Sequence, residues 1–300
     1  MNHKISIIFA IRIESGARMR NLIANLRYLM QYEDVCIDII EAGDKRHFDF
    51  HSERIRYKFV KDHRPVLYRT YYINALLLNA KCSTIGIWDA DIIIPKEQID
   101  RSIEAVKKGS TIVLPYNGNV RFLDRRESDV FYRNYARLPD SAAGYRIMRR
   151  PSVGGALIVD KKKYWQIGRD NENIIGWGFE DIERIVRAEM LGAGIERADG
   201  VAFHLDHPVK DRPDSLTSYN RARFLDICRS SPEILLEEIS AMKGKFQYMK
   251  KWVRVMDEIE RLHQADIKNS ILCPEDKDIS AYFPVCGPDH YIGPQSAVFL

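Results

Sequence analysis

Short apolar runs rich in β-branched residues alternate with amphipathic helical segments along the first two thirds of this 300-residue chain. Continuous apolar runs are typical of strands buried on both faces, and their alternation with helices indicates βαβ units. The sequence therefore predicts an α/β fold with a mostly parallel central sheet flanked by helices. The expected strands are Ile5–Ile11, Val35–Ile40, Ile55–Val60, Thr84–Trp88, Thr111–Pro115, Ser152–Val159 and Val201–Leu205, and the expected helices are Arg18–Met30, Tyr68–Asn79, Pro95–Lys108 and Glu180–Leu191.

Two other regions have a different character. Asn117–Arg150 is polar and rich in Arg and Tyr, and we expect an irregular functional connection there. From about residue 213 the strand pattern stops, and helices are expected over Ser215–Arg229 and Pro232–His263. The sequence thus predicts a catalytic domain at 1–212 and a helical extension with a tail at 213–300. The apolar stripe that includes Ile234, Leu235 and Ile239 favours packing on the domain over a membrane or partner surface.

Composition narrows the partners and the compartment. The formal charge of +4 fits an anionic ligand, but it is too small to indicate nucleic acid. The five cysteines are scattered without a C-x-x-C pair, which favours a reducing compartment over a disulfide framework. The N-terminal apolar run is too short for a signal peptide, and no apolar stretch is long enough for a membrane span. We expect a cytoplasmic protein, with peripheral contact to the inner membrane left open.

The first motif with chemical content is Asp89-Ala90-Asp91, which closes the apolar strand Thr84–Trp88. Ligands in parallel sheets bind beyond the C-terminal strand ends, and carboxylates two residues apart on extended backbone point the same way. Such a pair can hold a divalent cation whose shell is completed by phosphate oxygens. Asp276-Lys277-Asp278 has the same spacing in the polar tail, so context rather than pattern favours the first pair. On sequence context alone, Asp89-Ala90-Asp91 fits a metal site and an ordinary turn equally well.

The second motif is Gly176-Trp-Gly-Phe-Glu-Asp-Ile-Glu183, at the start of an expected helix. Glycines allow tight turns and close approach to a ligand, and the flat face of Trp177 can stack on a sugar ring. Glu180 and Asp181 are candidates for an acid–base group aimed at a hydroxyl nucleophile. Carboxylates also stabilise a helix N-terminus through its dipole, and for the acidic pair taken alone this structural role is the stronger interpretation.

Three smaller patterns complete the candidate set. His204 and His207 follow the last expected strand, and imidazole is a good ligand for Mn²⁺; spacing does not decide between them, although His204 is preferred. Arg12 and Arg69 stand among basic residues suited to pairing with a pyrophosphate, or to a solvated basic face. Gly154-Gly155 precedes an apolar strand, where it is either a plain bend or a close backbone approach to a sugar.

Taken in chain order, these motifs resemble the C-terminal catalytic region of the β-1,4-galactosyltransferase family. The resemblance extends to polypeptide N-acetylgalactosaminyltransferases and bacterial chondroitin-polymerase-type enzymes. The resemblance covers roughly residues 5–210. Its specific part is the block from Gly176 to Asp181 with the preceding Gly154-Gly155. Phe179 stands where the animal enzymes have a second glycine, and Ile182 interrupts their longer acidic run. Both departures bear on the acceptor more than on the chemistry.

The resemblance implies a GT-A fold and an inverting transfer from a UDP-sugar, with Mn²⁺ or Mg²⁺ as cofactor. It implies a hexose or N-acetylhexosamine donor and a saccharide or lipid-linked saccharide acceptor, in bacterial surface polysaccharide synthesis. By position, Asp181 matches the catalytic base. The implied acceptor and sugar contacts are Trp177, Glu180, Gly154 and Gly155; the nucleotide contacts are Ala10, Arg12, Glu41, Arg69 and Asp89; and the metal ligands are Asp91 with His204 or His207.

Two rival functions remain open from the sequence. A sugar-nucleotide pyrophosphorylase shares the general architecture, but such enzymes open with a Gly-rich phosphate loop, and Phe9–Arg20 contains a single glycine. A non-catalytic sugar- or nucleotide-binding module is the other rival. The acidic residues and both histidines argue against a decayed site.

Overall fold

A seven-stranded mixed sheet forms the centre of the computed structural model, which describes residues 3–48, 52–135, 137–139, 151–208 and 214–241. All neighbouring strands run parallel except at β8, which is antiparallel to both of its neighbours. This confirms the predicted α/β class with a mostly parallel sheet. The strand order is β3 (Ile55–Lys61), β2 (Val35–Gly43), β1 (Ile5–Ile11), β4 (Thr84–Trp88), β8 (Ala156–Asp160), β6 (Ile112–Leu114) and β9 (Ile195–Arg197).

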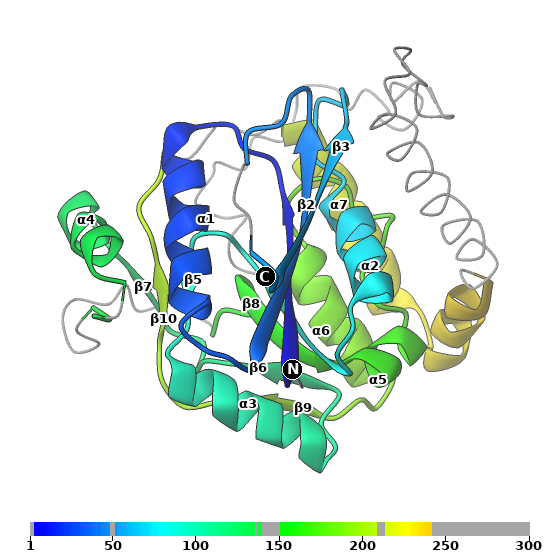
Figure 1. The fold of residues 1–300 in the computed structure, drawn as a ribbon. Helices are drawn as coiled ribbons and strands as arrows, with labels where there is room; N and C mark the ends of the chain where they lie inside the picture. Colours follow the sequence, from blue (N-terminus) through cyan, green and yellow to red (C-terminus); the bar gives the residue numbers. More distant parts are fainter. Residues whose placement is uncertain (1–2, 49–51, 136, 140–150, 209–213, 242–300) are drawn as a thin grey trace.

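Helices cover both faces of this sheet, and Figure 1 shows α1 and α2 on opposite sides of the central strands. Alternate side chains of β1 enter two separate apolar clusters: Ile7 and Phe9 lie in one, and Ile8 and Ala10 in the other. The unbroken apolar run at the N-terminus is thus explained by burial on both faces. The covering helices are α1 (Gly16–Leu29), α2 (Arg69–Asn79), α3 (Lys96–Lys108), α5 (Lys161–Gln166) and α6 (Glu180–Met190).

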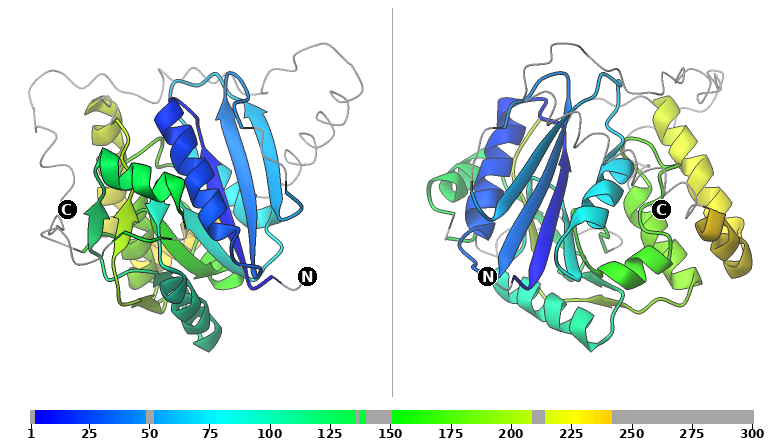
Figure 2. Two further views of the ribbon diagram at one scale, coloured as in Figure 1. Left: turned by 60° about the vertical axis from the view of Figure 1, so that its left-hand side comes forward. Right: turned by 45° about the vertical axis from the view of Figure 1, so that its right-hand side comes forward.

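The chain changes direction at β1, and this places the candidate residues. It proceeds from β1 through β2 to β3 on one side, and then returns to add β4 on the other side of β1. Figure 2 shows β1, β2 and β3 side by side as a twisted layer against α1. In an open α/β sheet, the crevice beyond the C-terminal strand ends at such a reversal is where ligands bind. Asp89 and Asp91 follow the C-terminal end of β4 there.

A smaller sheet joins distant parts of the chain beside this edge. Its order is β5 (Ile92–Ile93), β10 (Ala202–His204) and β7 (Val120–Phe122), with His204 opposite both Ile92 and Phe122. The expectation of an irregular connection from 117 to 150 was wrong for its first half. It contains β7 and then α4 (Arg125–Arg133), which begins with a capping box between Asp124 and Glu127. Residues 136 and 140–150 lie outside the described part.

The first expected C-terminal helix is present as α7 (Asp214–Arg229), and residues 232–241 are helical. Leu235 and Ile239 are buried, as expected for packing positions, whereas Ile234 is 49% exposed and does not pack. The remainder of the second expected helix and the tail lie outside the described residues. Within the part of the chain that is described, no helix has the length and apolar character needed to cross a membrane. The division at residues 212 and 213 stays a prediction.

Candidate active site

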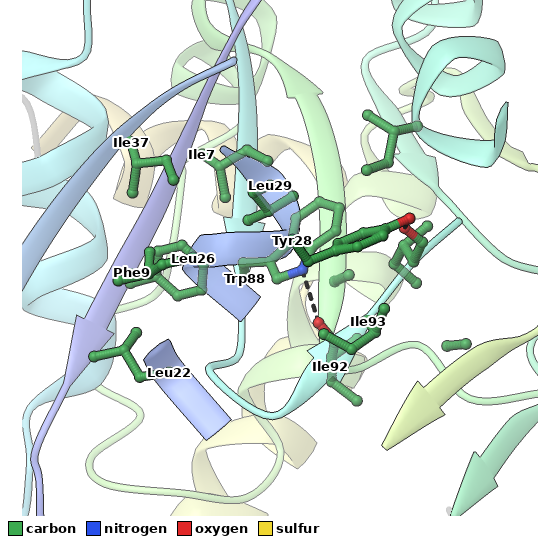
Figure 3. Close-up of a cluster of buried hydrophobic side chains, with 14 of the residues drawn as sticks. Ile7, Phe9, Leu22, Leu26, Tyr28, Leu29, Ile37, Trp88, Ile92 and Ile93 are labelled. Atoms are coloured by element: carbon green, nitrogen blue, oxygen red, sulfur yellow. Dashed lines mark hydrogen bonds between the residues drawn. The ribbon is translucent and has the colours of Figure 1, made fainter. Parts of the chain in front are cut away.

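Buried polar contacts hold the turn that carries Asp89 and Asp91. Figure 3 shows Trp88, at the end of β4, packed among apolar side chains of β1 and α1, with its indole N–H donating to the carbonyl of Ile92 at 3.0 Å. The side-chain amide of Asn25 donates to the same carbonyl at 2.8 Å and lies 3.3 Å from the carbonyls of Asp89 and Ala90. Asn25 is fully buried. These bonds hold the turn in one conformation.

Asp91, His204 and His207 form a cluster with metal-ligand geometry. One ligand atom from each lies within 4.8 Å of the other two. The Nε2 atom of His207 is 2.8 Å from Asp91 Oδ2, and that of His204 is 4.0 Å from Asp91 Oδ1. The backbone N–H of Leu205 donates to the Asp91 carbonyl at 2.8 Å, which fixes β10 against the turn. Both histidines left open by the sequence therefore reach the same carboxylate.

The electrostatics of this cluster favour an ionised carboxylate. Burial raises the pKa of Asp91, but the hydrogen bond with His207 and the charges of both histidines outweigh it and hold the pKa below its usual value. One carboxylate and two imidazoles suit Mn²⁺ and similar transition ions, whereas Mg²⁺ prefers an all-oxygen shell. The donor set thus fits the predicted cofactor, and of the two ions considered it favours Mn²⁺.

The second half of the site lies at the N-terminus of α6, where the backbone is strained. Phe179, the residue before the helix, has φ +68°, which is the left-handed region, and Gly178 before it has φ +101°. Glu180 follows and is only 4% exposed. Burial and the charge of Asp181 raise the pKa of Glu180 to about 7, although Arg69 and Arg184 oppose the shift. Near neutral pH this carboxyl group can therefore donate as well as accept a hydrogen bond.

Several buried polar atoms at this point have no hydrogen-bond partner among the described residues. They include Glu180 Oε2, Asp181 Oδ1 and Arg69 Nη1. Such atoms are costly in a folded protein unless a ligand or water satisfies them. Arg184, three residues after Asp181 on α6, places its Nη1 atom 3.3 Å from Asp181 Oδ1 and also pairs with buried Asp170. The set has the composition of a polar ligand site.

Arg69 joins the two halves. It lies at the start of α2, is largely buried, and forms an ion pair with Asp89. Burial lowers the pKa of Arg69, but the charges of Asp89 and Asp181 outweigh it and raise the pKa overall. One guanidinium thus pairs with the aspartate turn and interacts electrostatically with the acidic pair of α6. The charges of Asp89, Glu180 and Asp181 all act on the Arg69 guanidinium.

Gly154 and Gly155 allow the backbone before β8 to approach these groups. A Cβ atom at Gly154 would overlap the Asp181 carboxylate, with the Cγ atom only 3.1 Å away. Gly155 has φ +85°, and a Cβ atom there would lie 2.8 Å from Cγ1 of Ile92. The phenol of Tyr116 donates to the Gly154 carbonyl at 2.6 Å. The glycine pair thus lets the backbone lie against Asp181 and Ile92, and its approach to a sugar stays a prediction.

Trp177 is 47% exposed at the tip of the loop before α6. The loop is held by a residue that the sequence analysis missed, the fully buried Asn220 of α7. Its side-chain amide donates to the carbonyls of Ile175 at 2.8 Å, Trp177 at 3.2 Å and Gly178 at 3.1 Å. Asn220 carries no motif signal because it acts only through folding. Arg184 had a weak signal in its helical spacing from Asp181.

The predicted nucleotide residues on or just after β1 and β2 lie at the same sheet edge, and most of their polar atoms already have partners. The exception is Arg12 Nη2, which makes no hydrogen bond among the described residues and lies 3.4 Å from Asp62 Oδ2. Arg12 donates to the carbonyls of Ala42 and Arg64 at 3.1 and 2.8 Å. Glu41 is 1% exposed and accepts from the backbone N–H groups of residues 47 and 48 and from the Tyr57 phenol. Glu41 therefore orders the loop after β2. Ala10 is buried within β1. Their contacts with a nucleotide stay predictions.

An α/β sheet with a metal-ligand cluster and an acidic pair, of which Glu180 is buried and Asp181 partly exposed, at its C-terminal edge is the architecture of an enzyme site. The family model described as the N-terminal domain of galactosyltransferase matches residues 140–208, which include the glycine pair, the Trp177 loop and both histidines. This match confirms the predicted resemblance to the galactosyltransferase family of glycosyltransferases. Comparison with curated protein sequences gave no match.

Three solved structures show a distant similarity. GalNAc-T7 with UDP, GalNAc and Mn²⁺ is 14% identical, with 74% of this chain and 48% of that chain covered and a TM-score of 0.48. The catalytic domain of Drosophila β1,4-galactosyltransferase 7 with xylobiose is 16% identical, with 65% of each chain covered and a TM-score of 0.42. A mutant of that enzyme with manganese, UDP-Gal and xylobiose gives 14%, 65%, 65% and 0.42. The chain thus spans between about half and two thirds of these proteins.

Proposed function

We propose that this chain is an inverting, metal-dependent glycosyltransferase that transfers a hexose or N-acetylhexosamine from a UDP-sugar to a saccharide acceptor. The observation that carries the proposal is the placement of two sets of groups on one edge of the sheet. The cluster of Asp91, His204 and His207 is linked through Asp89 and Arg69 to the acidic pair at the start of α6. Sugar transfer needs both kinds of group close together, because the metal cluster would meet the diphosphate of the donor and the acidic pair would meet the acceptor hydroxyl.

The reaction is a single displacement at the anomeric carbon. The acceptor oxygen forms the new bond as the bond to the diphosphate breaks, and Asp181 takes the acceptor proton. When bound to the three-residue cluster, the divalent ion would supply positive charge beside the leaving diphosphate. Arg69 adds a fixed positive charge on the same side. Because Arg184 contacts Asp181 Oδ1, the other oxygen of that carboxylate, next to Gly154, is the one assigned to the proton.

Glu180 and Trp177 are assigned to the sugars. The flat, exposed indole of Trp177 offers a stacking face for a sugar ring. Glu180 has a pKa of about 7, so its carboxyl group can form hydrogen bonds with hydroxyl groups in either protonation state. The Oε2 atom of Glu180 has no partner among the described residues, which suits contact with a ligand.

Two finer proposals rest on the sequence resemblance. The first is a role in bacterial surface polysaccharide synthesis. The second is a lipid-linked saccharide acceptor reached by peripheral contact with the inner membrane. Transfer to a free oligosaccharide at the same rate as to its lipid-linked form would count against the second.

The direct test measures UDP release from a panel of UDP-sugars with Mn²⁺, with and without saccharide acceptors. A transferase releases UDP in proportion to the glycosylated product, and chelation of the metal stops it. Formation of UTP from UDP-sugar and pyrophosphate would instead identify a pyrophosphorylase. Binding of UDP without turnover of any donor would identify a non-catalytic module, and either result would overturn the proposal.

A further inference from the structure

Two thiols meet at the N-terminal edge of the central sheet, at the opposite strand ends from the candidate active site. Cys36 is the second residue of β2, and Cys82 lies in the loop that leads into β4. Their Sγ atoms are 3.9 Å apart. The residue between them is Ser6 of β1, which is opposite Cys36 on one side and Ile85 on the other. Sequence spacing gives no sign of this pair because Cys36 is in β2 and Cys82 is in the loop before β4, on opposite sides of β1.

The two thiols differ in access. Cys36 is 8% exposed, and its Sγ atom lies 3.1 Å from the Ser6 hydroxyl. Cys82 is partly exposed, and its backbone N–H donates to the same hydroxyl at 3.3 Å. Ser6 thus holds both cysteines in place. A dissolved reagent can reach Cys82 first, whereas Cys36 is shielded behind it.

They also differ in acidity. The hydrogen bond with Cys36 lowers the pKa of Cys82 to about 6, and the charge of nearby Arg56 adds to this effect against burial and the charge of Asp38. The hydrogen bond with Cys82 and burial raise the pKa of Cys36. The partly exposed Cys82 is therefore the more acidic thiol of the pair, and the buried Cys36 lies behind it. This is the arrangement of an attacking and a resolving cysteine.

We propose that Cys36 and Cys82 are an oxidation site that forms an intramolecular disulfide when the protein meets a hydroperoxide. The Cys82 thiolate attacks the peroxide oxygen, which gives a sulfenic acid at Cys82 and releases the alcohol, or water from hydrogen peroxide. The Cys36 thiol then attacks the Cys82 sulfur, a disulfide bond forms and a second water leaves. Two thiols are oxidised and one peroxide is reduced. The sulfurs, 3.9 Å apart, must approach by about 2 Å to bond.

The link would tie β2 to the segment before β4, across β1. The Asp91 cluster and the N-terminus of α6 lie at the other strand ends, so the disulfide is expected to leave the transfer reaction unchanged. A covalent link between distant parts of the chain restricts the unfolded state. We therefore expect the oxidised protein to have a higher midpoint of thermal unfolding, by about 2 °C or more.

The test uses the full chain, reduced and then exposed to graded hydrogen peroxide. After the remaining thiols are alkylated, tryptic peptides are analysed by mass spectrometry without reduction. Cleavage at Lys and Arg places Cys36 in peptide 28–45 and Cys82 in peptide 82–96. We expect these two peptides to appear joined at peroxide concentrations that do not oxidise the exposed thiol of Cys228, which is then recovered in its alkylated form. The joined species should disappear on reduction with a dithiol.

The variants Cys36→Ser and Cys82→Ser define the order of events. With Cys36→Ser the sulfenic acid should accumulate at Cys82 and be trapped by dimedone. With Cys82→Ser, Cys36 should remain unoxidised. The wild-type peptide map does not depend on either variant folding. The proposal is overturned if the joined peptides are absent when Cys228 is already oxidised, if the links are intermolecular, or if Cys82 is oxidised directly to a sulfonic acid.

Discussion

The carboxylate of Asp181 lies directly against the backbone of Gly154, so closely that a single methyl group at position 154 would overlap it. Gly154 precedes β8 and Asp181 is the second residue of α6, and each belongs to a different motif of the sequence. Because Gly154 has an ordinary backbone conformation for an L-residue, its requirement is this contact and not a special φ. The contact with Gly154 therefore determines the position of the Asp181 carboxylate, the proposed base.

The first prediction follows from this contact. Gly154→Ala should displace the Asp181 carboxylate and lower kcat by about 10²-fold, because a misplaced catalytic group costs that much. UDP affinity, measured by calorimetry with Mn²⁺, should be nearly retained. Gly16→Ala is the matched control, since a Cβ atom there meets nothing within 4 Å. Equal rates for both variants would show that Asp181 does not depend on Gly154.

The second prediction concerns Asp181 itself. Asp181→Asn keeps the size of the side chain but removes its basic oxygen, so transfer should fall by about 10²-fold or more. The fold and donor binding should survive. Glu189→Gln, an exposed position on the same helix, controls for loss of a negative charge. The comparison requires kcat and KM for each protein. Near wild-type transfer by the Asn variant would place the base elsewhere.

The third prediction concerns the metal cluster. Asp91→Ala should abolish Mn²⁺-dependent binding of UDP, because it removes the one carboxylate that both histidines approach. His204→Ala and His207→Ala should each weaken that binding, and titration calorimetry measures all three. Asp206→Asn removes a neighbouring exposed carboxylate that is not in the cluster, and it should bind like the wild type. Unchanged Mn²⁺ affinity in the Asp91 variant would refute the assignment.

The fourth prediction is a pH dependence of stability due to Glu180. Its pKa is raised from 4.5 to about 7 in the folded protein, so the folded state binds the proton more tightly than the unfolded state. The contribution of Glu180 to the free energy of unfolding should therefore be fully present below about pH 4.5 and be lost as the pH rises to about 7. Denaturant unfolding of wild type and Glu180→Gln across this range measures it. The wild-type free energy minus that of the variant should fall with pH, and a constant or rising difference would contradict the burial argument.

The fifth prediction concerns Asn220, which holds the Trp177 loop from α7. Asn220→Ala leaves three loop carbonyls without their donor and should lower the free energy of unfolding by about 1–3 kcal/mol. It should also raise the KM for the acceptor, because Trp177 loses its support. Ser218→Ala, at an exposed position of the same helix, provides the control. An acceptor KM that stays constant while stability falls would separate the loop from acceptor binding.

The sequence by itself determined the framework of the protein. Apolar runs such as Ile5–Ile11 are long and β-branched, and a strand buried on both faces is the structure that hides every one of their side chains. The positions of Asp89, Asp91 and Asp181 were also readable, because each stands where a strand ends or a helix begins. These are local properties, and local patterns in the chain carry them.

Only the tertiary structure decided which distant groups act together. Pairing of β10 with β5 brings both histidines to Asp91, and no spacing rule could have selected that register. Arg69 joins Asp89 to the α6 carboxylates because α2 and α6 both begin at the same sheet edge. Glu41 is satisfied by its own loop, since the chain after β2 folds back onto it. Contacts between segments far apart in the chain depend on strand order and packing, and the one-dimensional pattern does not encode either in a readable form.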